Sequence, residues 1–142
     1  MKVHSGQHDG LRWAGNWRAS VCLGNVVVAE PHRKTINAFL VAGACGVYIS
    51  GGFGAWELLY PAIAMPVAYR GLRDYRFIGA VWLMHAAWDL PHHLWNRPIW
   101  PFQPTSSLGC MIFDSLIAIW FLANAPAIIG NRQSIDATGR SR

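Results

Sequence analysis

Residues 77–95 read FIGAVWLMHAAWDLPHHLW, an apolar run that contains three histidines and one carboxylate. On an α-helix, with about 100° per residue, His85, Asp89, His92 and His93 fall within an arc of roughly 100°. Tryptophan and leucine cover much of the remaining surface, where an amphipathic helix of a soluble protein would carry Lys and Glu. The run therefore predicts an apolar helix with one polar face.

The composition predicts a membrane protein. The chain has 142 residues, enough for one domain, and is 53% hydrophobic and 13% charged, whereas soluble domains carry about 25% charged residues. No Asp, Glu, Lys or Arg occurs in the 22 residues between Lys34 and Glu57 or in the 17 residues between Asp114 and Arg132. A bilayer core about 30 Å thick needs roughly 20 such residues, and about 17 at least. We therefore expect an all-α fold, a polytopic integral membrane helical bundle.

Four transmembrane helices are expected, over residues 36–51, 55–69, 77–95 and 108–129. They form a predicted membrane helical domain of residues 30–130. Two tails flank this domain: residues 1–29, which are polar with a short apolar segment, and residues 131–142, which are basic and predicted to be disordered.

Lysine and arginine are distributed unequally between the two sides that four spans define. Eleven lie on the side of both termini, and Arg97 alone lies on the other side. Because cytoplasmic loops carry such an excess, we expect the plasma or inner membrane, with both termini cytoplasmic and the lipid bilayer as partner. The basic residues form no exposed stripe, so nucleic acid is not expected as a partner. A homo-oligomer is left open. The three cysteines form no CxxC pair, and no structural disulfide is expected.

This orientation brings further polar residues to the depth of the histidines. Glu57 begins the second expected span, and Asp114 lies near the start of the fourth. Together with His85, Asp89, His92 and His93, they give six ionisable side chains in the outer half of the bundle. Ionisable groups in an apolar bundle face its interior and one another. The sequence therefore predicts a polar pocket built by the second, third and fourth helices.

Imidazoles and carboxylates together suit transition metals such as zinc or iron. His85 and Asp89 have the i, i+4 spacing by which one helix face offers two ligands to one metal ion. The hypothetical ligands of a divalent metal are His85, Asp89 and either His92 or His93. Glu57 or Asp114 would complete or orient the site, and these two are the catalytic candidates. No further cofactor-binding residue is predicted.

Three classes of function fit this pocket. In an enzyme, a metal-bound water would act as nucleophile and a carboxylate as base, in hydrolytic or redox chemistry on a lipidic or small substrate. In a small proton-coupled carrier, the histidines would relay protons. In a purely structural bundle or assembly subunit, the polar groups would only hold helices together. Pro91 is the weak point of the pocket, because proline removes one helical hydrogen bond and can move His92 and His93 off the polar face.

Five segments carry a resemblance to a known family: EPHRKTINAFLVAGA, SGGFGAWELLYP, YRGLRDYRFIG, HAAWDLPHH and PIWPFQPTSSLGCMIFDSLIAIWF. Over about Glu30 to Pro126, the chain resembles a microbial family of small integral membrane proteins of unknown function, domain of unknown function 6010. The resemblance implies a membrane location but no activity and no catalytic residue. Relatives look as though they have a further hydrophobic helix before the EPHRK segment. A fifth, N-terminal span therefore appears lost or degenerate in this chain.

Overall fold

The computed structural model describes residues 25, 28, 30, 32–50, 52–100 and 103–125, and within them the chain is helical with no β-strand. The elements are, in order, α2 (His32–Cys45), the 3-10 segments η1 (Gly46–Ser50) and η2 (Gly54–Leu58), α3 (Leu59–Arg70), α4 (Tyr75–Leu94) and α5 (Ser106–Leu122). The four α-helices occupy the four ranges in which helices were expected. The two predicted tails lie outside the described residues, apart from positions 25 and 28, so the division of the chain into three parts stays a prediction.

The membrane-spanning architecture expected from the sequence is wrong. In the described part of the chain, no helix combines the length and the apolar character needed to cross a bilayer. α5 is mostly apolar but ends at Leu122 after 17 residues, whereas the expected span ran to residue 129. α4 has 20 residues, but Arg76, Asp89 and three histidines make it too polar. The charge-based orientation, the plasma- or inner-membrane location and the cytoplasmic termini depended on these spans and fall with them.

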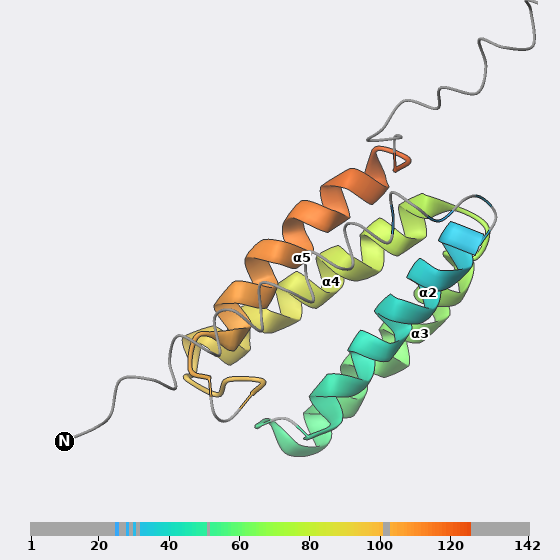
Figure 1. Ribbon diagram of the computed structural model, residues 1–142. Helices are drawn as coiled ribbons and strands as arrows, with labels where there is room; N and C mark the ends of the chain where they lie inside the picture. Colours follow the sequence, from blue (N-terminus) through green and yellow to red (C-terminus); the bar gives the residue numbers. More distant parts are fainter. Residues whose placement is uncertain are drawn as a thin grey trace, which may run out of the picture.

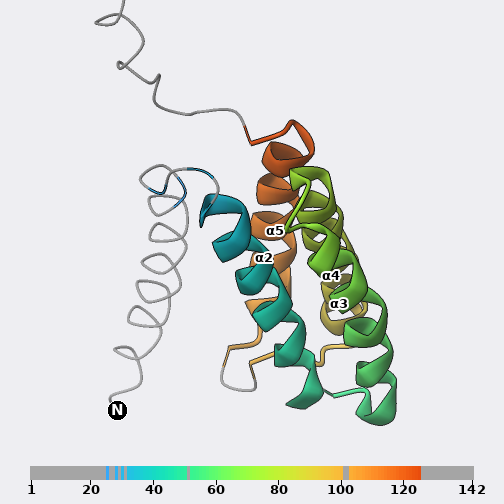
Figure 2. The same cartoon turned by 90° about the vertical axis from the view of Figure 1, so that its right-hand side faces the viewer.

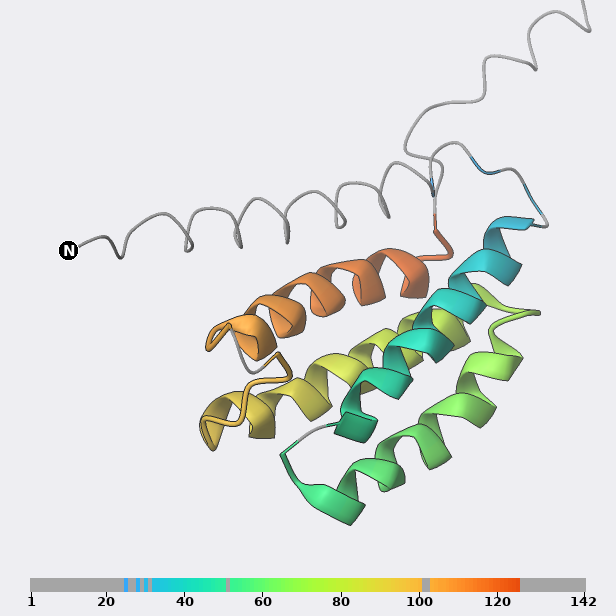
Figure 3. The same ribbon diagram turned by 60° about the horizontal axis from the view of Figure 1, so that its bottom comes forward.

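The helices form two antiparallel hairpins, α2 with α3 and α4 with α5, which Figure 1 shows as two pairs of neighbouring ribbons. α4 packs against each of the other three helices. Figures 2 and 3 show that η1, η2 and the connection from α4 to α5 lie at the same end of the bundle. The polar half of α4 runs toward this end, so the fold surrounds it with the start of α5 and the turn between α2 and α3.

The inward face of α4 changes character along the helix. Its first turns bury the apolar side chains of Ile78 and Val81 against a core that includes Ala118 and Phe121 of α5. Gly79 sets the distance between the two helices, because a Cβ at this position would lie 2.9 Å from both the carbonyl oxygen of Ala118 and the backbone nitrogen of Leu122. Backbone atoms cannot move away as a flexible side chain can, so the close α4–α5 contact requires glycine here.

Arg33 closes the end of the bundle opposite to the polar half of α4. Its Nε donates to the hydroxyl of Tyr75 at the start of α4 at 2.8 Å, and its Nη2 donates to the carbonyl oxygen of Ala125 at 3.3 Å. The same guanidinium pairs with Glu30 at 3.2 Å. One charged side chain of α2 therefore joins the beginning of α4 to the end of α5.

Both helices of the second hairpin end in a Schellman motif with asparagine in the left-handed conformation. Asn96 has φ 53° and Asn124 has φ 64°. After α4, the N–H of Asn96 donates to the carbonyl of His93, and that of Arg97 donates to the carbonyl of His92. Asparagine tolerates this conformation better than most residues, which explains its place after each helix. The connection then returns to α5, where Ser106 and Ser107 accept hydrogen bonds from the backbone of Trp100 and Ile99.

Replacement of Gly79 by alanine tests the close α4–α5 packing. We expect Gly79→Ala to lower the free energy of unfolding by about 2 kcal/mol, because overpacking a tight helix contact costs about 1–3 kcal/mol. Gly43 in α2 is the matched control, since a Cβ there meets no atom within 4 Å. Gly43→Ala should leave stability unchanged or raise it by up to about 1 kcal/mol through helix propensity. Urea denaturation measures both, and equal effects of the two substitutions would contradict the packing argument.

Candidate functional site

The polar face of α4 points into the bundle, with one exception. His85, Asp89 and His92 are buried, with exposed fractions of 5%, 0% and 0%. His93, which the sequence placed on the same face, is exposed. Pro91 lies inside α4 and the helix continues past it to Leu94, so the proline does not move His92 off the face. The structure therefore buries three of the four residues predicted as ligands on this helix and leaves His93 exposed.

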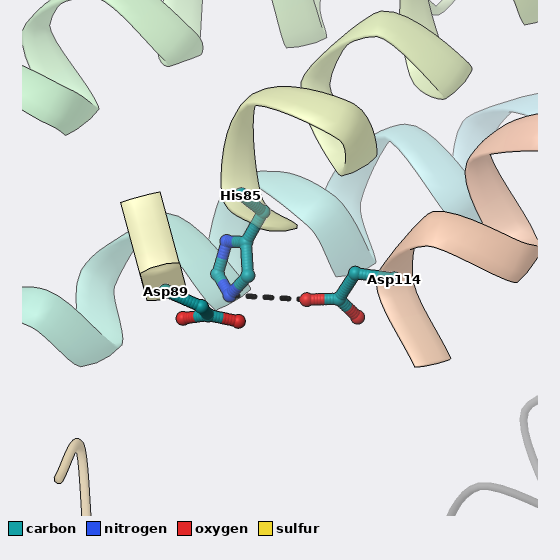
Figure 4. A group of neighbouring side chains, drawn as sticks. All are labelled: His85, Asp89 and Asp114. Atoms are coloured by element: carbon teal, nitrogen blue, oxygen red, sulfur yellow. Dashed lines mark ion pairs between the residues drawn. The ribbon is translucent and has the colours of Figure 1, made fainter. Parts of the chain in front are cut away.

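The first buried group consists of His85, Asp89 and Asp114. One donor atom of each residue lies within 4.8 Å of a donor atom of each of the others. Nε2 of His85 is 3.6 Å from Oδ2 of Asp114. Figure 4 shows this imidazole pointing from α4 toward the Asp114 carboxylate on α5, with the Asp89 carboxylate beside it. Asp114 was predicted as a catalytic or completing residue, and the structure places it directly against His85.

Two tyrosines that sequence reasoning missed complete the surroundings of this group. Tyr48 lies in η1, just after the end of α2, and its hydroxyl donates to Oδ1 of Asp89. The hydroxyl of Tyr60 in α3 lies 3.1 Å from Nδ1 of His85. Both tyrosines are buried. A signal was present in the sequence: a phenol within an apolar run has a hydroxyl that needs a partner when the helix is buried.

Burial determines the protonation of this group. It lowers the pKa of His85 from 6.5 to about 4, so the imidazole is neutral near pH 7 despite its short distance to Asp114. Burial raises the pKa of Asp89 to about 7, and the hydrogen bond from Tyr48 offsets only part of this effect. The pKa values of Tyr48 and Tyr60 are also raised by burial, so both hydroxyls keep their protons. Oδ2 of Asp89 has no hydrogen-bond partner in the described structure.

The second buried group is the pair Glu57 and His92. Glu57 in η2 is 1% exposed, and its Oε1 lies 3.3 Å from Nε2 of His92. Both carboxylate oxygens also accept hydrogen bonds, Oε1 from the backbone N–H of Phe53 at 3.0 Å and Oε2 from Nε1 of Trp88 at 3.2 Å. Glu57 was predicted to join the metal site or to act in catalysis. The structure pairs it instead with His92, which the metal hypothesis had also included.

Hydrogen-bond geometry fixes the proton of His92 on one ring nitrogen. Nδ1 lies 2.9 Å from the carbonyl oxygen of Arg97, which can only accept, so Nδ1 carries a proton. A neutral ring would then turn the lone pair of Nε2 toward the Glu57 carboxylate, which is itself an acceptor. The contact is attractive only when Nε2 is protonated too. The 3.3 Å contact is therefore an ion pair only in the form in which both ring nitrogens of His92 carry protons, and Nε2 makes no hydrogen bond within the described structure.

Tyr48 connects the two groups. Its ring centroid lies 4.8 Å from that of His85 and 5.4 Å from that of His92, and it stacks on the latter with an interplanar angle of 26°. On its other side, His92 contacts the ring of Phe53 at 4.5 Å. The sequence predicted one pocket of six residues. The structure has two adjacent groups, each buried, with a tyrosine between them.

Asp89→Asn tests the raised pKa of Asp89. The pKa of Asp89 in the folded protein, about 7, lies above the ordinary value of 3.8. The stability that this group contributes is therefore complete below about pH 4 and lost as the pH rises through 7. His85 acts in the opposite sense, because its pKa is lowered. The free energy of unfolding of Asp89→Asn should therefore rise relative to that of wild type between pH 4 and pH 7. The expected gain is about 1.4 kcal/mol per pH unit, up to about 4 kcal/mol.

Urea denaturation at pH 4, 5.5 and 7 in the presence of a chelator measures this difference. Asp74→Asn is the matched control, because Asp74 caps the start of α4 and accepts from the backbone of Arg76. Its difference in stability from wild type serves as the reference. A constant difference between Asp89→Asn and wild type would contradict the raised pKa.

His92→Phe tests the buried ion pair. Phenylalanine keeps the ring contacts with Tyr48 and Phe53 but leaves the Glu57 carboxylate buried without a counter-charge. We expect a loss of about 3 kcal/mol in the free energy of unfolding, which is typical when one partner of a buried pair is removed. His93→Phe, at the exposed neighbouring position, should change stability by less than about 0.5 kcal/mol. If both variants unfold at the same urea concentration, no ion pair is present.

The family relationship follows from a comparison with known proteins. No curated protein and no solved structure matches the chain. One family model matches residues 18–127, which cover α2 to α5 and all residues of both buried groups. The chain therefore belongs to the family of unknown function DUF6010.

Proposed function

We propose that this protein binds one divalent transition-metal ion between α4 and α5. Its ligands are Nε2 of His85 and one carboxylate oxygen each of Asp89 and Asp114. The observation that carries the proposal is the approach of these three donors to within 4.8 Å of one another in the core of the bundle. Oδ2 of Asp89, which has no hydrogen-bond partner in the described structure, is a ready ligand atom.

The distances are close to those of a metal site. Zinc binds imidazole nitrogen and carboxylate oxygen at about 2.0–2.2 Å, which places the donors of a tetrahedral site about 3.3–3.5 Å apart. The 3.6 Å between His85 and Asp114 is near this value. The other donor atoms lie within 4.8 Å of one another, and movements of side chains, not of helices, would bring them to this spacing. A set of one nitrogen and two oxygens suits zinc or ferrous iron.

The protonation of the group also favours a cation. A metal ligand must be a neutral imidazole or a deprotonated carboxylate, and burial already keeps His85 neutral by lowering its pKa. The raised pKa of Asp89 reflects a buried carboxylate without a positive partner among the described residues. A divalent ion would supply that missing charge.

The two tyrosines are suited to orient the ligands. A histidine that binds a metal through Nε2 usually donates its Nδ1 proton to an oxygen, and the Tyr60 hydroxyl stands 3.1 Å from Nδ1 of His85. Tyr48 holds Oδ1 of Asp89 and leaves Oδ2 to the ion. With three protein ligands, such a site keeps one position for a water or a small ligand, as catalytic zinc sites do.

Metal titration of protein without an affinity tag tests the proposal. We expect one Zn²⁺ per chain by calorimetry and elemental analysis, and an increase in thermal stability on binding. Asp89→Asn combined with Asp114→Asn should weaken zinc binding by at least about 100-fold, because both charged ligands are lost while shape is kept. His93→Ala removes an exposed histidine of the same helix and should bind zinc as wild type does.

Two results would overturn the proposal. Metal contents below about 0.1 per chain in wild type after growth with added zinc and iron would leave the polar groups a packing role only. Equal zinc binding by wild type and the double variant would place the ion at other histidines of the chain.

A further inference from the structure

An open cleft lies beside the buried Glu57–His92 pair, apart from the proposed metal centre. Its volume is about 600 Å³, and most of its lining is aromatic, from Phe53, Trp56, Trp88 and Trp95. Trp56 and Trp95 are 72% and 65% exposed. Aromatic side chains on the protein surface with so much free area are typical of sites that bind a flat apolar group.

Arg97 supplies the charge of this cleft. Its guanidinium lies over the ring of Phe53, with Cζ 5.8 Å from the ring centroid, and Nη1 donates to the carbonyl oxygen of Gly52. That bond uses one of five N–H groups of the guanidinium. Within the described residues, no carboxylate forms an ion pair with Arg97. The side chain is exposed and held in place, and no carboxylate in the part of the chain that the structure describes neutralises its charge.

The carboxylate of Glu57 already has partners. Its two oxygens accept hydrogen bonds from Phe53 and Trp88, two residues of the cleft lining. The charge of Glu57 is paired with His92 at 3.3 Å. A cation in the cleft would therefore meet the guanidinium of Arg97 without gaining a carboxylate partner, whereas an anion would gain a partner.

We propose that the cleft binds a small organic anion with a flat apolar body. Its carboxylate would pair with the free edge of the Arg97 guanidinium, which matches the two oxygens in a bidentate way. Its apolar body would lie against the indole rings of Trp56 and Trp95. This proposal does not depend on the metal centre, because it involves none of the three metal ligands.

Three naphthalene probes of the same size separate charge from shape. Isothermal calorimetry and saturation-transfer NMR are used with 2-naphthoate, 2-naphthylmethanol and 2-naphthylmethylammonium on the full chain. We expect 2-naphthoate to bind about tenfold more tightly than the neutral alcohol, and the ammonium to bind most weakly. Arg97→Gln should remove the preference for the anion, and Trp56→Ala with Trp95→Ala should weaken all three probes.

Arg70→Gln is the matched control. Arg70 is the last residue of α3, whereas the cleft lies near the first residues of that helix. Like Arg97, it lies over a phenylalanine ring, with Cζ 5.9 Å from the centroid of Phe77. It should leave the binding of 2-naphthoate unchanged. Tighter binding of the ammonium probe, equal binding of acetate and 2-naphthoate, or no binding of any probe at millimolar concentration would each overturn the proposal. The free energy of unfolding, measured by urea denaturation, checks that each variant keeps the fold.

Discussion

The structure depends on one constraint, which is that the charges of three buried carboxylates must be compensated. Glu57, Asp89 and Asp114 lie within an apolar bundle at exposed fractions of 1%, 0% and 3%. Each buried charge costs several kcal/mol unless it is paired or neutralised. Glu57 is compensated by two N–H donors and by His92. Asp89 has one hydrogen bond and a raised pKa. This difference between the two carboxylates is the reason why we propose a metal ion at Asp89 and not at Glu57.

The fold answers this constraint by bringing polar groups from five elements together. α4 contributes His85, Asp89 and His92, and the other elements each bring a partner for one of them. The partners are Glu57 from η2, Asp114 from α5, Tyr48 from η1 and Tyr60 from α3. Because these elements are far apart in sequence, no segment could form either group alone. The order of the hairpins places η1, η2 and the start of α5 at the same end. Both buried groups depend on this placement.

The sequence predicted the helices and the convergence of polar residues better than it predicted their environment. The inward face of α4 followed from helical periodicity, and the meeting of Glu57 and Asp114 with this face followed from the order of the helices. That argument had placed the residues in a bilayer. The prediction is wrong, because no described helix is both long enough and apolar enough to cross one. Apolar runs were counted across turns, as at Asn124, where α5 has already ended. A run of apolar residues therefore indicates where a helix lies more reliably than it indicates what surrounds that helix.

The division into two groups could not be predicted, because it depends on side-chain positions. His92 and His93 are neighbours in sequence, and a rotation of about 100° separates a buried partner of Glu57 from an exposed ring. Tyr48 and Tyr60 were not considered, since neither belongs to a motif. Their roles come from contacts over 41 and 25 residues of sequence.

The Schellman motif at Asn96 places two functions on one residue. The backbone carbonyl of Arg97 accepts a hydrogen bond from Nδ1 of His92, while the side chain of Arg97 borders the aromatic cleft. The same peptide thus touches the buried ion pair and the solvent-facing cavity. A ligand that shifted the backbone of Arg97 would therefore also change its hydrogen bond with His92. By thermodynamic reciprocity, a change in that bond would alter the affinity of the cleft in return.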